Sequence, residues 1–376
     1  MDAQTTGQGA ARRFTGVGVV FSLLGLALFA YFVWKAGPAL IWAQMSALGW
    51  GFLVILCVSA VRPVVRALTW TRCFETTHTL KFRDALTAYL IGDALGNLMP
   101  LGIVVSEPAK AALVRERVPL VAAASALTVE NLFYMLSVAL FIFAGMAALL
   151  LSFPLPSKMR IVSYATLGGI VVVLLAAYVV IRRRWKFLSG AVNFFAARGV
   201  GRSFAERRGS SFVSLEDRVY GFYGRHGARF LPILLLEFCF HLAGVVEVFA
   251  TVYFITGSRP TWLAAFVLES VNRVINVVFK FVPMRFGVDE AGTNWFTKLF
   301  RLGENVGVTL AIVRKVRVVV WTAVGVALLV RRGLTVRGAA REAQAAARDV
   351  AAGRKGANDV TARVAVANES FAARNP

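Results

Sequence analysis

The chain has 376 residues, of which 58% are hydrophobic and 16% are charged, and its formal net charge is +22. Soluble domains contain about a quarter charged residues, so this composition excludes an ordinary water-soluble domain. A basic excess in a soluble protein would indicate a nucleic-acid partner. Here the Lys and Arg residues gather in loops between apolar segments, which instead favours a membrane with anionic lipids and no nucleic-acid partner.

About six apolar segments approach or exceed the roughly 20 residues that a membrane-spanning helix requires. A short segment, 1–13, precedes the first of them, and a tail rich in Ala and Arg, 331–376, follows the last. The sequence therefore predicts an all-α polytopic membrane protein with about six spanning helices. These helices are residues 14–34, 48–70, 119–151, 161–181, 230–256 and 305–330.

Two further apolar segments are each interrupted near the middle by a proline and a glycine. Neither half of either segment is long enough to span a bilayer. Irregular backbone at membrane depth is tolerated only inside protein or beside a water-filled cavity. Two re-entrant helical hairpins are therefore predicted, with two kinked spanning helices as the alternative. The segments are 84–115, broken at Pro100 and Gly102, and 263–302, broken at Pro283 and Gly287.

The loop charges predict an orientation. The loops 71–83 and 182–229 are basic, whereas the connections 35–47, 152–160 and 257–261 are short and nearly uncharged. Positively charged loops stay in the cytoplasm. We therefore expect a multi-pass protein of the bacterial inner membrane with both termini cytoplasmic. In this orientation the first hairpin enters from the cytoplasm and the second from outside.

The two broken segments also resemble each other. Glu107 follows Pro100 by seven residues, and Glu290 follows Pro283 by the same distance. Matched broken helices of opposite orientation are typical of the inverted repeats of transporters. The prediction is one flippase-like membrane domain, 14–330, with repeat one at about 48–151 and repeat two at about 230–330.

Many cations fall within predicted membrane segments, where charges are costly and mostly face a cavity or a partner. Arg62 and Arg66 are four residues apart, and Arg314 and Arg317 are three apart, so each pair shares one helix face. Two such faces on a common cavity would bind a phosphate through bidentate hydrogen bonds. The candidate headgroup-binding residues are Arg62, Arg66, Lys110, Arg273, Arg314 and Arg317.

Acids in the same segments would organise these cations, or bind a proton if transport is coupled. The candidate cavity acids are Glu107, Glu130 and Glu290, and other ionisable residues in the segments are Asp93, Glu237, His241, Glu247, Glu269 and Asp289. The alternative is internal ion pairing, of Glu130 with Arg314 or of Glu107 with Lys110. The three histidines form no metal-binding pattern, so neither a metal nor a cofactor is expected.

The order and spacing of these motifs resemble the membrane domain of lysylphosphatidylglycerol synthase/flippase proteins over residues 50–330. The first half carries Asn97-x-x-Pro100-x-Gly102, then Ser106-Glu107-x-x-Lys110, then Ser125 and Glu130. The second half carries Pro283-x-x-x-Gly287-x-x-Glu290-x-Gly292, then Leu302-Gly303, then Arg314-x-x-Arg317. One departure is Ser106-Glu107, where the family often has Gly-Asp, so the acid is kept and the glycine is not.

This resemblance implies a flippase-like fold that moves phospholipids or other amphiphiles between leaflets. Short members of the family accompany hopanoid or other isoprenoid-lipid pathways, so an association with a lipid-biosynthesis enzyme is also implied. Full-length synthases carry an aminoacyl-transferase domain after the membrane part, whereas about 45 residues follow the last predicted helix here. We therefore expect a lipid flippase or transporter and no enzyme activity.

Two other functions compete with this interpretation. A membrane-embedded lipid-linked glycosyltransferase usually keeps an acidic residue in the first outside loop, but residues 35–49 contain no Asp or Glu. A non-transporting partner subunit of a lipid-synthesis enzyme would not need so many charges at membrane depth. We expect the lipid headgroup in a cavity between the two hairpins.

Overall fold

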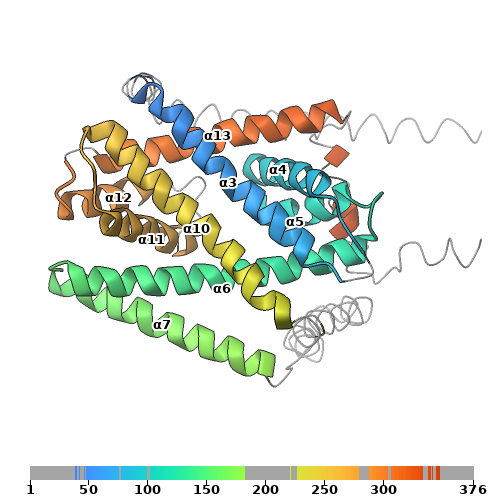
Figure 1. Cartoon of the computed structure of the whole chain (residues 1–376), viewed down its shortest axis with the longest axis horizontal. Coiled ribbons are helices and arrows are strands. Elements are labelled where there is room, and N and C mark those ends of the chain that lie inside the picture. Colours follow the sequence, from blue (N-terminus) through green and yellow to red (C-terminus); the bar gives the residue numbers. More distant parts are fainter. Residues whose placement is uncertain are drawn as a thin grey trace, which may run out of the picture.

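A computed structural model of the chain describes residues 48–75, 78–99, 102–182, 227–278, 288–303 and 306–332, with a few single positions outside these ranges. Every regular element in this part is an α-helix, which confirms the predicted all-α class (Figure 1). The helices are α3 (Gly51–Arg72), α4 (Phe82–Leu98), α5 (Gly102–Leu113), α6 (Leu120–Ser152), α7 (Ser157–Arg182), α10 (Gly227–Thr256), α11 (Trp262–Val278), α12 (Val288–Leu299) and α13 (Val306–Arg331).

Four helices in the described part are long and apolar enough to cross a membrane, namely α3, α6, α10 and the Ser157–Ala176 part of α7. They coincide with four of the predicted spanning segments. The helix α13 is 26 residues long, but Arg314, Lys315 and Arg317 interrupt its apolar sequence. The predicted helix 14–34 lies outside the described residues.

The long helices run between two ends of the molecule, which lie at the right and the left of Figure 1. At one end, the Trp70 indole near the end of α3 donates to the Ala123 carbonyl near the start of α6, at 3.4 Å. At the other end, Phe153 after α6 packs against Phe300 after α12, with ring centroids 4.3 Å apart. The helix α7 packs along α6 and exposes most of its other apolar side chains, as a lipid-facing helix does.

The helices α4 and α5 fall in the segment of the first predicted hairpin, pack against each other and lie in one half of the molecule (Figure 1). They have 17 and 12 residues, so each is shorter than the roughly 30 Å thickness of a bilayer core. Gly96 and Gly102 permit their close approach, because a Cβ on Gly102 would lie 1.7 Å from the Gly96 carbonyl oxygen. Asn97 donates to the Thr322 hydroxyl of α13 at 3.0 Å. Pro100 lies outside the described residues.

The helices α11 and α12, also of 17 and 12 residues, pack against each other in the opposite half of the molecule (Figure 1). The side chain of Ile275 on α11 fits against Gly292 on α12, where a Cβ would lie 2.6 Å from the Ile275 Cδ1 atom. The predicted break at Pro283 and Gly287 falls between these helices and outside the described residues.

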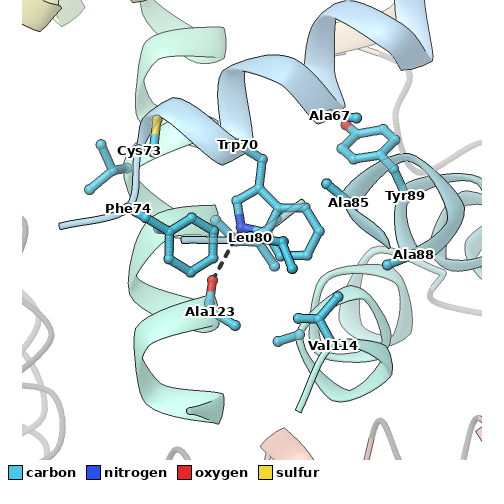
Figure 2. Packing of buried hydrophobic residues seen from close by; sticks show 14 of the residues in the cluster. Ala67, Trp70, Cys73, Phe74, Leu80, Ala85, Ala88, Tyr89, Val114 and Ala123 are labelled. Carbon is cyan, nitrogen blue, oxygen red and sulfur yellow. Dashed lines mark hydrogen bonds between the residues drawn. The ribbon is translucent and has the colours of Figure 1, made fainter. Parts of the chain in front are cut away.

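A packed cluster joins the end of α3 to α4, α5 and α6 (Figure 2). Trp70 of α3 is fully buried and lies beside Ala85 and Ala88 of α4 and Ala123 of α6. Small residues at membrane-helix contacts allow the backbones to approach closely. This packing fixes the last turns of α3, and with them the side chain of Arg66 one turn earlier.

Candidate functional site

Two groups of buried ion pairs meet at α3. The Arg66 cluster consists of Arg66, Tyr89, Asp93, Glu107, Lys110, Glu130, Asn131 and Glu237. The Arg62 cluster consists of Arg62, Glu247, Glu269, Asn272, Arg273, Asp289, Thr293, Arg314 and Arg317. Because Arg62 and Arg66 are one helical turn apart, the two clusters are neighbours along this helix.

The Arg66 guanidinium is surrounded by polar groups from three other helices, α4, α6 and α10. Its Nε atom lies 2.7 Å from Glu130 Oε1 and 2.6 Å from the Tyr89 hydroxyl, and its Nη2 atom donates to Asn131 Oδ1 at 2.9 Å. Its Nη1 atom lies 3.8 Å from Glu237 Oε2. Glu130 and Glu237 are both fully buried. One buried cation therefore faces two buried carboxyl groups.

Lys110 of α5 is the second cation of this cluster. Its ammonium group lies 2.8 Å from Asp93 Oδ1 and 3.0 Å from Glu107 Oε1, which confirms the predicted pairing of Glu107 with Lys110. It also lies 3.7 Å from the ring centroid of Tyr89, at the distance of a cation–π contact. Asn131 donates to Glu107 Oε2 at 3.0 Å and so links this pair to the groups around Arg66.

The Arg62 cluster is centred on Glu269 of α11, which is fully buried. Its carboxylate lies 2.5 Å from Arg273, 3.3 Å from Arg62 and 3.5 Å from Arg314. Gly244 of α10 leaves the space for this contact, because a Cβ there would lie 2.5 Å from Glu269 Oε1 and 2.6 Å from Arg62 Nη2. A single carboxylate thus holds three guanidinium groups, which come from α3, α11 and α13.

Two more acids complete the cluster. Glu247 of α10 forms ion pairs with Arg62, at 3.2 Å, and with Arg317. Asp289 of α12 lies 3.6 Å from Arg314, which also donates to the Thr293 hydroxyl at 3.3 Å. Both helices of the α11–α12 pair therefore contribute acids to this site.

The two clusters have opposite excess charge. In the Arg62 cluster four guanidinium groups face three carboxylates, whereas in the Arg66 cluster two cations face four carboxyl groups. One buried nitrogen atom in each of Arg62, Arg273 and Arg314, and one in Arg66 of the other cluster, makes no hydrogen bond among the described residues, although Arg314 Nη2 lies 3.5 Å from Glu269. Unused guanidinium donors can bind a further anion. The Arg62 cluster can therefore accept a negatively charged group.

His241 lies on α10 between the acids of the two clusters. Its Nε2 atom is 3.0 Å from the Ser137 hydroxyl, and its ring stacks on Phe141 with centroids 4.7 Å apart. Within the part of the chain that the structure describes, no group of three or more His, Cys, Asp and Glu residues could hold a metal ion.

All six predicted cations lie in these two clusters, and so do the predicted acids Glu107 and Glu130. The side chain of Glu290 is outside the described part. The predicted pairing of Glu130 with Arg314 is wrong. Glu130 pairs with Arg66, and Arg314 pairs with Glu269 and Asp289, so the two residues belong to different clusters.

Sequence reasoning missed the neutral partners of the cations. Tyr89 and Asn131 both contact Arg66, and Tyr134 places its ring centroid 4.0 Å from the Arg66 guanidinium carbon. Asn131 had a usable signal, since it follows Glu130 within a long and otherwise apolar helix. Tyr89 and Tyr134 carry no such signal, because tyrosine is generally enriched near the ends of membrane helices whether or not it contacts a cation.

Comparison with known proteins identifies a family whose sequence model covers the region that contains both clusters. The sequence model of one family, described as the lysylphosphatidylglycerol synthase TM region, matches residues 16–325. No curated protein and no solved structure matches the chain. The match includes every residue of both clusters, and it confirms the resemblance that the sequence motifs predicted.

Proposed function

The chain belongs to the family of the lysylphosphatidylglycerol synthase TM region, and on that premise we propose that it is a lipid flippase or transporter. Its cargo is a phospholipid or another amphiphile with an anionic headgroup, which it moves between the leaflets of the inner membrane. It acts without catalysing a reaction. A lipid-biosynthesis enzyme that delivers the cargo is the partner class that this function implies.

The excess of guanidinium groups in the Arg62 cluster is the observation that supports this proposal most. Arginine at membrane depth is costly, and an uncompensated one needs an anion. A lipid phosphate accepts several charge-assisted hydrogen bonds at once, and the guanidinium fork matches its geometry. The Arg273 Nε atom, which has no hydrogen-bond acceptor among the described residues, and the Arg314 Nη2 atom, whose carboxylate partner Glu269 is 3.5 Å away, are suited to that group.

The placement of the helix pairs supports an inverted-repeat mechanism. The pairs α4–α5 and α11–α12 are too short to span and lie in opposite halves of the molecule (Figure 1). We propose that both are re-entrant hairpins, the first entering from the cytoplasm and the second from outside. Substrate sites of transporters with inverted repeats lie where such broken helices meet. The headgroup would then bind near mid-depth while the acyl chains remain in lipid.

Transport by reconstituted protein tests this function. Vesicles that contain a fluorescent anionic phospholipid report its movement when a membrane-impermeant quencher is added. We expect the full chain to accelerate this movement, and Arg314→Gln to slow it by about 10-fold or more, since a hydrogen bond to a charged group contributes about 1.5–3 kcal/mol. Arg160→Gln changes an exposed cation on α7 and should transport normally.

A second variant separates cargo binding from structural pairing. Asp289 is an acidic partner of Arg314, so Asp289→Asn should remove the buried carboxylate that Arg314→Gln leaves without its cation. If Arg314 binds cargo, the double variant should recover thermal stability but not transport. Recovery of both would show that Arg314 serves only to neutralise Asp289.

A further inference from the structure

The Arg66 cluster contains a buried carboxyl group without an adequate ionic partner. Glu130 and Glu237 are each fully buried and share the single guanidinium of Arg66. Glu130 lies 2.7 Å from Nε, whereas Glu237 comes no closer than 3.8 Å. The carboxyl oxygens of both residues lack a hydrogen-bond partner among the described residues, so their distances to Arg66 distinguish the two acids. Glu130 is therefore the closer ionic partner of Arg66, and Glu237 is the more weakly paired acid.

A buried carboxylate that lacks a partner is costly, and such a group becomes neutral by taking up a proton. The other acids of the cluster differ, because Asp93 and Glu107 have side chains that are 49% and 34% exposed and both contact Lys110. Water can stabilise their charge. The uncompensated charge therefore falls on the pair at Arg66.

We propose that the Glu130–Glu237 pair binds one proton, which Glu237 carries in this structure, and that cargo and proton move together. The proton-binding part stands by itself, and the coupling rests on the proposed function. A protonated pair reduces the negative charge beside the Arg62 cluster and so favours binding of an anion there. Loss of the proton adds a negative charge and promotes release of the anion.

The surroundings of the pair are consistent with this role. The charged and titratable groups that face it are Arg66 and Cys73 at α3, Tyr89 on α4, Glu107 and Lys110 on α5, and Arg229 on α10, with the hydroxyl of Thr69 beside Glu237. The two cations other than Arg66 already have partners elsewhere. Lys110 pairs with Asp93 and Glu107, and Arg229 donates to the Phe74 carbonyl at 3.2 Å.

A route for the proton is present at the end of α3. Ile233, one helical turn before Glu237 on α10, lines a pocket of about 450 Å³ together with Phe74 and Arg229. On the other side of the pair, Asn131 connects Arg66 to the partly exposed Glu107. We propose that the proton exchanges with water through this pocket or through Glu107.

Infrared spectroscopy of the full chain in lipid nanodiscs tests proton binding directly. We expect a carbonyl band of a protonated carboxylic acid at neutral pH, lost in Glu237→Gln and retained in the control Glu116→Gln, which changes an exposed acid after α5. Glu130→Gln should also lose the band, because Glu237 then ionises to pair with Arg66. Each single variant should fold, and the double variant should be unstable. An unchanged band in Glu237→Gln would overturn the proposal.

Transport in vesicles with an imposed pH difference tests the coupling. The difference should change the rate of anionic phospholipid movement severalfold in the unmodified protein and not in Glu237→Gln. If the infrared band is present but the transport rate does not change with the pH difference, the coupling is refuted and proton binding by the pair still stands. If the unmodified protein moves no lipid under any condition, the proposed function fails and the coupling with it, while the infrared band still decides whether the pair binds a proton.

Discussion

Arg62 and Arg66 are four residues apart on α3, yet their guanidinium groups pair with acids of two different clusters. Arg62 contacts Glu269 in the second hairpin at 3.3 Å, and Arg66 contacts Glu130 of α6 at 2.7 Å. One turn of a single helix thus connects an acid-rich cluster to a cation-rich one. A movement of α3 would change both clusters together.

Removal of the Arg66 charge should be strongly destabilising. Arg66→Met leaves Glu130 and Glu237 buried without their shared cation, and breaking a buried ion pair by deleting one partner costs about 3–5 kcal/mol. Thermal unfolding in detergent should therefore occur at a clearly lower temperature. Arg160→Met on exposed α7 should change stability by no more than about 0.5 kcal/mol. Equal unfolding temperatures for the two variants would contradict the ion pairing at Arg66.

Gly244→Ala should disturb the Arg62 cluster without altering a charge. The added Cβ would lie within 2.6 Å of both the Arg62 guanidinium and the Glu269 carboxylate, so this pair must separate. Overpacking of this kind costs about 1–3 kcal/mol. We expect lower thermal stability and slower lipid transport in vesicles. The matched control is Gly168→Ala on α7, where an added Cβ meets nothing within 4 Å, and a wild-type rate in both variants would argue against a role for the Arg62–Glu269 contact.

Gly102→Ala should weaken the first hairpin. Its Cβ would lie 1.7 Å from the backbone oxygen of Gly96, and backbone cannot move aside as a flexible side chain can. The helices α4 and α5 must separate, and we expect a loss of about 1–3 kcal/mol that lowers the midpoint of thermal unfolding. Gly169→Ala on α7 is the control and should be neutral or slightly stabilising, because Ala favours helix over Gly by about 1 kcal/mol. Similar unfolding midpoints for Gly102→Ala and Gly169→Ala would contradict the close contact between Gly96 and Gly102.

The proposed orientation can be tested by cysteine labelling of intact cells. The native cysteines, Cys57, Cys73 and Cys239, are first replaced. A cysteine in place of Ser258, in the connection between α10 and α11, should react with an impermeant reagent added outside, whereas one in place of Ser210 should react only after permeabilisation. Labelling of the Ser210 variant in intact cells would reverse the orientation and remove the basis for inverted repeats.

The lengths and positions of the spanning helices follow from the sequence alone. The predicted segments 48–70, 119–151 and 230–256 match α3, α6 and α10 to within about three residues at each end. Bilayer thickness sets the required apolar length, so hydropathy along the chain is sufficient to find such helices. The break between α4 and α5 was also predictable, because proline and glycine act on the local backbone.

The pairing of buried charges was decided by the tertiary structure. The sequence identified Arg62, Arg314 and Glu130 as charges at membrane depth, yet it could not choose among several acids for each cation. Arg62 and Glu269 are 207 residues apart in the chain, and they meet because Gly244 lets α10 pass close to both. Coulomb energy depends on distance and burial in space, which no local pattern encodes. For this reason the sequence determined which charges enter the membrane, and only the fold separated them into one cluster with excess cations and one with excess acids.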